Sequence, residues 1–364
     1  MPHVLTAQQA TLKGTVISAD DFEPIPGVHV FIASSMIGTV TNDEGEYSLT
    51  HLPPGAVRLT FSMVGFETLI ILVFVKPGEA RTLEIDLKPH AFQLDGIIVE
   101  ARRDKKWQRQ LKRFTRHFLG QTPNAGNTEI TNPEVLDFTI EDGRFRASAS
   151  EPLFIENRAL GYLIHFHMKD FLEYKGAIHY QGVSFYEELV PEDVSQAAEW
   201  KSKREEAYHG SRSHLLRALF HNRLEEEQFE LYEHRSPQLP QTDKLAVEDL
   251  YAFQLPTQRV REAHDLVHTS TDSLTRRLDF ESVVEIVYKG ELESSAFLRW
   301  QSYKYDSGEV GFQQSWMVMR EPNILVDHNG SLLNPYDLMY YGYLSFEAFA
   351  DELPYEYGLG APLQ

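Results

Sequence analysis

The sequence predicts a multi-domain protein in which an all-β sandwich is followed by an α+β domain with a mostly antiparallel sheet. Three observations predict this: short strand-like runs fill residues 12–87, a basic segment occupies residues 97–121, and strand-like and helix-like patterns alternate in residues 122–364. Short strands at even spacing, separated by Gly and Pro turns, are typical of a sandwich or barrel. A chain of 364 residues is long enough for two or three domains with cores of their own.

The strands of the first domain are rich in β-branched and aromatic residues. The expected strands are LKGTVIS, VHVFIAS, GEYSLT, AVRLTFSMV, ETLIILVFV and ARTLEIDL. They are separated by turn signals at Pro26-Gly27, Asn42-Asp43-Glu44-Gly45, Pro53-Pro54-Gly55, Gly65 and Pro77-Gly78. The domain is therefore expected to span residues 11–96 and to contain no helix that could bring catalytic groups into a cleft.

Residues 97–121 differ in charge from the rest of the chain, with 8 Lys/Arg against 2 Asp/Glu. Trp107, Leu111, Phe114 and Phe118 fall on one face of a helix, and basic residues occupy the remainder. Such a linker helix can lie on a membrane surface. The alternative is that its apolar face packs onto the next domain while its cations offset the acidic remainder of the chain.

Residues 122–364 are expected to form the α+β domain. Strands are predicted in residues 152–189, a helical region in residues 190–234 with Ser195 as a possible N-cap, and further strands in LDFESVVEIVYKGEL, SAFLRWQSYKY and GFQQSWMVM. Trp200, Leu215, Leu216, Leu219 and Phe220 supply the apolar helix faces. The last segment combines an Asn-Gly turn with a short aromatic-rich helix.

Composition excludes several classes of function. The formal charge of −20 argues against nucleic acid as a partner, because phosphate binding needs clustered Lys and Arg. The absence of cysteine excludes disulfides, thiolate metal sites and a Cys nucleophile. No apolar run is long enough for a transmembrane helix. Residues 1–10 contain Leu5-Thr6-Ala7-Gln8, which is similar to the end of a signal peptide that is incomplete in this chain.

The turns of the first domain carry a set of motifs that occur together. These are Pro26-Gly27-Val28, GTVTNDEGEY at residues 38–47, Leu52-Pro53-Pro54-Gly55 and Val64-Gly65-Phe66-Glu67. With them the first domain resembles the carboxypeptidase-regulatory-like domain. The resemblance implies a transthyretin-like (prealbumin-like) sandwich, of the kind widespread in outer-membrane and periplasmic proteins of Bacteroidetes-type bacteria.

The second region resembles the carboxypeptidase-like regulatory domain-containing proteins of the same bacteria. The segments that carry this likeness are EPLFIENRALGYLIHF, YQGVSFYEEL, REEAYHGSRSHLLRAL and the closing LPYEYG. The resemblance implies no established activity for this region. In metallocarboxypeptidases the sandwich accompanies a peptidase, but the zinc-binding His-Xaa-Xaa-Glu of that peptidase is absent here.

The densest group of polar residues is Tyr208, Ser211, His214 and Arg217. Ser211, His214 and Arg217 are spaced by three, so on a helix they share one side. A Ser and a His at this spacing could form a nucleophile and its base, but no strained Gly-Xaa-Ser-Xaa-Gly turn surrounds Ser211. The alternative is a helix start near Gly210 and Ser211, with His214 and Arg217 bonded to neighbouring segments.

His165 and His167 are the only weak metal candidates that the sequence offers. Two residues apart on a strand, they project from the same face and could share an ion. No third ligand is indicated by the sequence, and no cofactor is predicted.

Aromatic residues crowd the C-terminal segment and could form either core or a face that binds a glycan or a protein. They are Tyr336, Tyr340, Tyr341, Tyr343, Phe346, Phe349, Tyr355 and Tyr357.

We therefore expect a non-enzymatic protein of the cell envelope, periplasmic or associated with the outer membrane, that binds an envelope protein or a glycan. Peripheral membrane contact through Trp107, Leu111, Phe114 and Phe118 is a further expectation. The competing hypothesis is an envelope hydrolase, a peptidase or glycosidase, that acts through the C-terminal domain with His165, His167, Ser211 or His214.

Overall fold

A computed structural model describes residues 10–89, 104–174, 177–234, 257–260, 262–270, 274–280, 283–301 and 310–358. The proposed signal-peptide residues 1–9 lie outside the described residues, and Ala10 begins the first strand. The chain separates into two compact units. Unit 1 comprises Met1–Leu111, Asn132–Phe154 and Ile164–Glu187, and unit 2 comprises Lys112–Thr131, Ile155–Leu163 and Glu188–Gln364.

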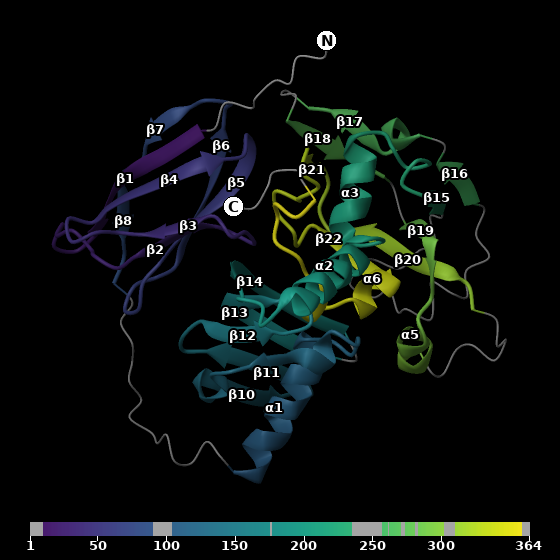
Figure 1. Cartoon of the computed structure of the whole chain (residues 1–364), viewed down its shortest axis with the longest axis horizontal. Coiled ribbons are helices and arrows are strands. Elements are labelled where there is room, and N and C mark those ends of the chain that lie inside the picture. Colours follow the sequence, from purple (N-terminus) through teal and green to yellow (C-terminus); the bar gives the residue numbers. More distant parts are fainter. Residues whose placement is uncertain are drawn as a thin grey trace. The chain divides into compact units, whose positions relative to one another are not determined.

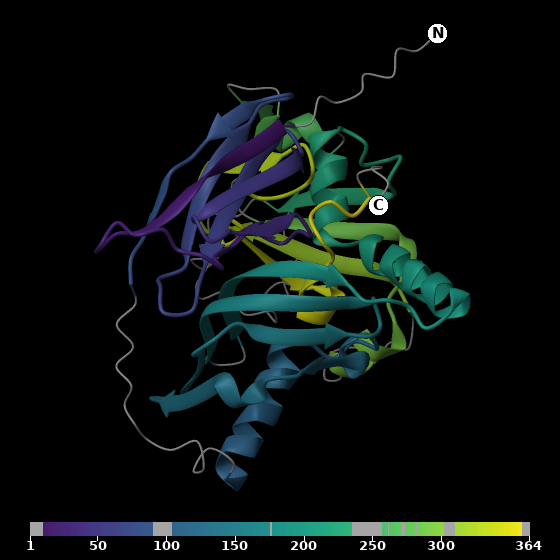
Figure 2. The same cartoon turned by 60° about the vertical axis from the view of Figure 1, so that its left-hand side comes forward.

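The N-terminal part of unit 1 is a β-sandwich, drawn in purple and blue in Figure 1 and from a second side in Figure 2. One sheet has the strand order β4-β1-β7, with β8 also paired to β1, and the other has the order β3-β2-β5-β6. The strands are β1 Ala10–Ser18, β2 His29–Ile32, β3 Gly38–Val40, β4 Glu46–Leu52, β5 Gly55–Ser62, β6 Leu69–Val75, β7 Ala80–Thr82 and β8 Ile85–Leu87.

Alternation of side chains along the strands places the sandwich core between the two sheets. Leu12 and Val16 of β1 are fully buried, as are Leu59 and Phe61 of β5. The ring of Tyr47 meets Phe61 edge-on, with the ring centroids 5.5 Å apart. Over residues 10–89, the part of this domain that the structure describes, its regular elements are all strands, as expected.

The segment ARTLEIDL does not form one strand but two, because of how it passes β1. β1 pairs in parallel with β7 through Thr11–Lys13 and with β8 through Val16–Ser18. Between these pairings Leu83 crosses so close to Gly14 that a Cβ there would lie 1.8 Å from the Leu83 carbonyl oxygen. Only glycine permits this approach. The short strand β3 was also not expected from the sequence.

The rest of unit 1 is an antiparallel sheet. β10 (Leu136–Glu141) pairs with β11 (Arg144–Ala149), and β11 pairs with β13 (Tyr162–Tyr174). β14 (Ala177–Glu188) also pairs with β13. The sequence predicted several short strands over residues 152–189, whereas β13 and β14 are long strands of 13 and 12 residues.

The sandwich is hydrogen-bonded to β14 within unit 1. The amide of Ser34 donates to the carbonyl oxygen of Ser184 at 2.6 Å, and the amide of Tyr186 donates to that of Ser35 at 2.9 Å. Beside these bonds, four apolar side chains form a cluster: Phe31, Ala33, Val183 and Phe185. The two parts of unit 1 are therefore joined by both backbone bonds and apolar contact.

Unit 2 is α+β, the class predicted for residues 122–364, although residues 132–154 and 164–187 of that range fall in unit 1. Its larger sheet is antiparallel with the order β16-β15-β19-β20-β22, and a smaller sheet has the order β17-β18-β21. The strands are β15 Phe229–His234, β16 Thr257–Val260, β17 Val267–Thr269, β18 Thr275–Leu278, β19 Val283–Leu292, β20 Phe312–Met319, β21 Ile324–Asp327 and β22 Leu338–Gly342. A further strand, β9 (Thr128–Ile130), pairs with residues 155–157 of β12 (Leu153–Asn157).

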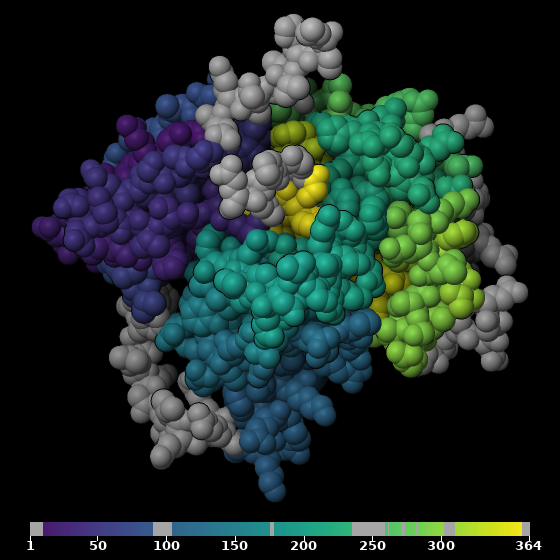
Figure 3. Space-filling model, viewed as in Figure 1, coloured from purple at the N-terminus to yellow at the C-terminus, as the bar shows by residue number. Residues whose placement is uncertain are grey.

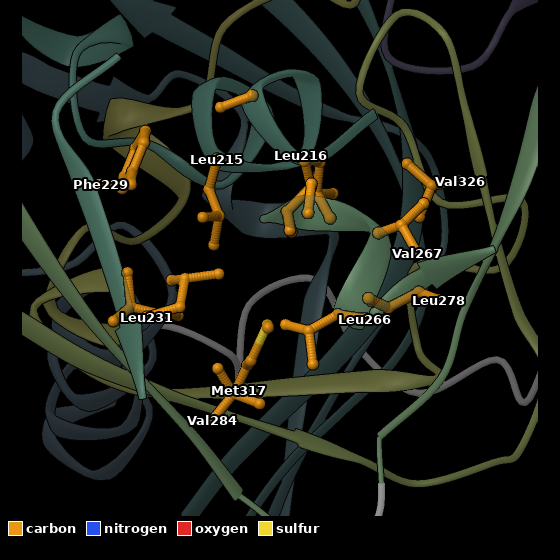
Figure 4. Packing of buried hydrophobic residues seen from close by; sticks show 14 of the residues in the cluster. Leu215, Leu216, Phe229, Leu231, Leu266, Val267, Leu278, Val284, Met317 and Val326 are labelled. Carbon is orange, nitrogen blue, oxygen red and sulfur yellow. The ribbon is translucent and has the colours of Figure 1, made fainter. Parts of the chain in front are cut away.

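The α-helices that begin in unit 2 are α2 Val194–Tyr208, α3 Arg212–Phe220, α5 Ser295–Trp300 and α6 Tyr343–Phe346. Short 3-10 turns are η2 Ala125–Asn127, η5 Ala263–Asp265 and η6 Phe349–Asp351, and η3 Pro133–Val135 lies in unit 1. Figure 4 shows Leu215 and Leu216 of α3 above Leu231 of β15, Val284 of β19 and Met317 of β20. This cluster is the main core of unit 2.

Three local expectations for unit 2 were wrong. Residues 229–234, placed in the helical region, form strand β15, because their alternating side chains pair with β19. SAFLRW forms helix α5 instead of a strand, since the Ser294 side chain accepts from the Phe297 amide and caps a helix. Helix α2 is capped by Asp193, which accepts from the Gln196 amide, and not by Ser195.

The predicted basic helix is present as α1 (Lys105–Phe118), but the expected membrane contact is contradicted. Phe114 and Phe118 have no exposed surface, so they cannot enter a bilayer. In unit 1 the Trp107 indole donates to the Leu136 carbonyl oxygen at 3.1 Å. In unit 2 Phe118 stacks on Phe349 with ring centroids 4.5 Å apart.

The first turn of α1, blue at the bottom of Figure 3, is exposed and carries lysines, while Leu111 is half-buried. The apolar face thus packs inside the protein, whereas the basic residues Lys105, Lys106, Arg109, Lys112 and Arg116 are exposed. No helix in the described ranges has both the length and the apolar character that crossing a membrane requires.

Phe118→Ala is expected to destabilise the protein by about 3–5 kcal/mol, because it leaves a cavity between Phe114 and Phe349. Urea denaturation followed by circular dichroism measures this change. Arg116→Ala, on the exposed side of the same turn, serves as control and is expected to change stability by less than about 0.5 kcal/mol. Equal effects of the two substitutions would contradict the burial of this face.

Candidate functional site

The four residues of the predicted polar group lie at the junction of α2 and α3. Tyr208 is the last residue of α2, Ser211 is the N-cap of α3, and His214 and Arg217 follow on α3. The ring of Tyr208 lies 4.9 Å from that of His214, and the Arg217 guanidinium lies 5.3 Å from the Tyr208 ring centre. The structure thus brings Tyr208, His214 and Arg217 together, whereas Ser211 caps the start of helix α3.

Ser211 begins helix α3. Its hydroxyl oxygen accepts a hydrogen bond from the His214 amide at 3.2 Å, which satisfies one of the free donors at the helix start. The His214 contact to Ser211 is therefore made by the backbone amide, and both imidazole nitrogens are bonded to other groups, Gly210 and Glu227. This is the arrangement of a helix cap, and it does not position a nucleophile against its base.

His214 is buried, and both of its ring nitrogens are bonded. Nδ1 accepts from the Gly210 amide at 3.0 Å, and Nε2 lies 3.1 Å from a carboxylate oxygen of Glu227. Because Nδ1 is an acceptor, the ring proton is assigned to Nε2, which donates to Glu227. Burial lowers the pKa of His214, and the hydrogen bond to Glu227 opposes that effect.

Gly210 is required for this bond. It adopts φ +79°, a conformation that favours glycine, and turns its amide toward His214. A Cβ at this position would lie 2.6 Å from the Gln313 side-chain oxygen. The imidazole is further enclosed by Phe229 and Tyr288, at ring distances of 4.9 and 5.7 Å.

Arg217 is buried and binds three backbone carbonyl oxygens. Nε donates to Asn329 at 2.6 Å, Nη1 to Tyr357 at 2.6 Å and Nη2 to Tyr355 at 3.0 Å. Charge-assisted bonds of this kind are stronger than neutral ones. Arg217 therefore connects helix α3 to the loop after β21 and to the closing segment LPYEYG.

Asp327, at the end of β21, belongs to the same network. One carboxylate oxygen accepts from the amides of Asn329 and Ser331, and the other accepts from the Tyr355 hydroxyl at 2.9 Å. The Asn329 side-chain amide also donates to that hydroxyl. Burial raises the pKa of Asp327 to about 6, although all three hydrogen bonds lower it.

A second buried carboxylate, Asp351, was missed by the sequence reasoning. The Thr122 hydroxyl and the Asn124 side-chain amide both donate to it at 2.9 Å. Burial raises the pKa of Asp351 to about 6. Glu227, Asp327 and Asp351 carry no sequence signal that separates them from the other acidic residues of this chain.

His165 and His167 are both on β13, as predicted, but they have separate neighbours in unit 1. His165 Nε2 lies 2.9 Å from a Glu187 carboxylate oxygen, whereas His167 Nδ1 is 3.0 Å from the Ser62 hydroxyl of the sandwich. Burial and the nearby His165 and His29 lower the pKa of His167 to about 4. Within the described ranges, no three His, Asp or Glu residues are placed to hold a metal ion.

The C-terminal aromatic residues are buried or half-buried, which favours the alternative in which they form core. Tyr341, Tyr343, Phe346 and Phe349 are buried. The other four, Tyr336, Tyr340, Tyr355 and Tyr357, are half-buried. Phe297 of α5 contacts Tyr343 at a ring distance of 4.8 Å, which explains why the aromatics gather here.

Residues 12–99 match the family model of the CarboxypepD_reg-like domain, which confirms the resemblance of the first domain. The chain is also similar to two TonB-dependent receptors of Formosa agariphila, P39 and P3, at 34% and 30% identity over 25% and 26% of its length. The matched region spans only 8% and 9% of those receptors. The matched segments do not reach most of the second region, whose resemblance stays a prediction.

Solved structures give weaker similarities. A type II cohesin–X-dockerin complex from Acetivibrio cellulolyticus is 18% identical, with 24% of this chain and 62% of that chain covered and a TM-score of 0.21. A DUF3823 family protein from Bacteroides ovatus is 14% identical, with 50% and 82% covered and a TM-score of 0.18. Superpositions this poor carry no functional argument.

Lowering the pH is expected to destabilise unit 1 through His167. A pKa of about 4 in the fold, against about 6.5 in the unfolded chain, means that the unfolded state binds the proton first as pH falls. The contribution is complete above pH 6.5 and decreases toward pH 4, by at most about 3 kcal/mol. Denaturation curves from pH 7.5 to 4.5 should be less pH-dependent in His167→Gln than in His264→Gln, an exposed control. Equal slopes would contradict this account.

Arg217→Lys is expected to release the closing segment, because an ammonium cannot reach three carbonyl oxygens in different directions. Hydrogen exchange at residues 355–357 should quicken, and stability should fall by about 2–4 kcal/mol. Arg223→Lys, at an exposed position, is the control. Unchanged exchange in Arg217→Lys would show that the guanidinium does not hold this segment.

Proposed function

We propose that this chain is a non-enzymatic protein of the cell envelope that binds another envelope component. The match of residues 12–99 to the CarboxypepD_reg-like domain carries this proposal. A sandwich of this kind presents a stable surface and contains no helix that would build a catalytic cleft. The two similar receptors are TonB-dependent, which supports a location in the periplasm or at the outer membrane.

The chemistry of unit 2 supports a structural role for its polar groups. Ser211 caps a helix, His214 is hydrogen-bonded at both ring nitrogens, and the Arg217 guanidinium donates to three backbone carbonyl oxygens. A hydrolase of the Ser–His type needs a hydroxyl within hydrogen-bond reach of a free imidazole nitrogen. The described residues of this group offer no such pair, so we favour binding over hydrolysis.

A protein is the partner that we favour over a glycan. Glycan sites present aromatic side chains to solvent, and the crowded aromatics of the C-terminal segment are buried or half-buried. Exposed apolar side chains are found on the sandwich at Phe22 and Val64 and in unit 2 at Val190 and Val194. Such surfaces are typical of contacts between proteins.

The intact chain, immobilised, is expected to retain an envelope protein from a detergent extract, and excess free chain should compete for it. A cytosolic fraction of the same cells is the matched control. Retention of cytosolic proteins alone would contradict the proposal. Retention of an envelope glycan alone would show that the partner is a glycan and not a protein.

Ser211→Ala and His214→Gln test the enzymatic alternative in the same preparation. Both are expected to bind the partner as the unchanged chain does, because Ser211 is a half-buried helix cap and His214 is buried. Hydrolysis of envelope peptides or glycans that disappears in both folded variants would overturn the non-enzymatic proposal. Stoichiometric zinc in the purified protein would do the same.

A further inference from the structure

Strand β6 presents an uncovered row of apolar side chains. Leu69, Ile71, Val73 and Val75 point into the sandwich core, so the residues between them point outward. Ile70, Leu72 and Phe74 are 43%, 46% and 49% exposed. β6 is also the last strand of its sheet, and no described strand is paired to its outer edge.

The other edge strands of the sandwich carry features that discourage pairing with another chain. β3 and β7 have three residues each, and β7 contains Arg81. β4 directs Glu46, Ser48 and Thr50 outward. Short edges and charged or polar side chains prevent unwanted strand addition. β6 has seven residues, LIILVFV, without a charge, a polar group or a proline.

The same sheet already uses its outer side for contact inside unit 1. Phe31 and Ala33, at and just after β2, pack against Val183 and Phe185 of β14, and Ser62 of β5 contacts His167. β6 lies beside β5, so its apolar row continues this face of the sheet. The row is therefore the part of an established contact face that remains open.

The sequence of β6 is complementary to itself in an antiparallel pair. With Leu72 opposite Leu72 of a second copy, Ile70 lies opposite Phe74 and Leu69 opposite Val75. All outward side chains then share one side of the joined sheet. Glu67 and Lys76 flank the strand and are exposed, so no charged residue lies within the paired segment itself.

We infer that β6 is a self-association edge, at which two copies of this chain join their sandwiches through antiparallel β6 strands. The pairing satisfies the outer amides and carbonyls of β6 and packs the apolar rows side by side. It does not depend on the proposed envelope partner. The contact covers one short strand from each copy, so the dimer forms in a concentration-dependent way.

Sedimentation equilibrium of the full chain over a range of concentrations tests this inference. The unchanged protein is expected to dimerise. Leu72→Lys places two like charges opposite each other and is expected to raise the dissociation constant at least about tenfold. Val40→Lys, at a 49% exposed position on the opposite edge of the same sheet, is the matched control and should dimerise normally. A monomer at every concentration, or equal effects of both variants, would overturn the inference.

A crosslinking experiment keeps the test decisive if Leu72→Lys fails to fold. The chain has no cysteine, so Leu72→Cys introduces a single thiol. A short bis-maleimide is expected to join two Leu72→Cys chains at least about tenfold faster than two Val40→Cys chains. Equal crosslinking rates for the two variants would show that a second copy does not occupy the β6 edge. The same conclusion would follow if the Leu72→Cys thiol became protected from the reagent only after an envelope protein was added.

Discussion

Hydrogen bonding of two buried side chains, His214 and Arg217, is the constraint on which the α2–α3 turn and the closing segment depend. A buried donor or acceptor that lacks a partner costs about 1–3 kcal/mol, and a buried charge costs more. Arg217 meets this requirement with three carbonyl oxygens, and His214 meets it with Gly210 and Glu227. These bonds fix the closing segment and the α2–α3 turn, and they leave the same groups with little capacity for chemistry.

The sequence predicted the sandwich well because its signals are local. Alternating apolar residues and Gly or Pro turns specify strands over a few residues, and β1, β2, β4, β5 and β6 all follow from them. The splitting of ARTLEIDL could not be predicted in this way. It depends on the approach of Leu83 to Gly14, two positions far apart in the sequence. Whether the aromatic side chains of α1 are buried or exposed likewise depends on residues distant in the sequence, such as Phe349.

The candidate site was only partly predictable for the same reason. The helix start at Ser211 is visible in a single sequence, since Ser is a preferred N-cap. The hydrogen-bond partners of His214 and Arg217 cannot be identified from a single sequence. Glu227 lies among three successive glutamates in a turn, and Asp327 resembles any other aspartate until β21 and the closing segment are brought together. The spacing indicated that Ser211, His214 and Arg217 share a helix face. Their structural roles depend on burial and on hydrogen-bond partners that are distant in the sequence.

The buried polar groups of unit 2 stabilise the fold, so we expect the protein to bind its partners through exposed side chains, including those of the sandwich. The state of His214 decides most directly whether that account is right. Nitrogen-15 chemical shifts of its ring should show Nε2 protonated and Nδ1 unprotonated at neutral pH, and the ring should titrate below the pH of a free imidazole, since burial lowers its pKa. A ring that exchanges between tautomers, or titrates near neutral pH with Nδ1 free, would contradict the claim that this histidine is structural.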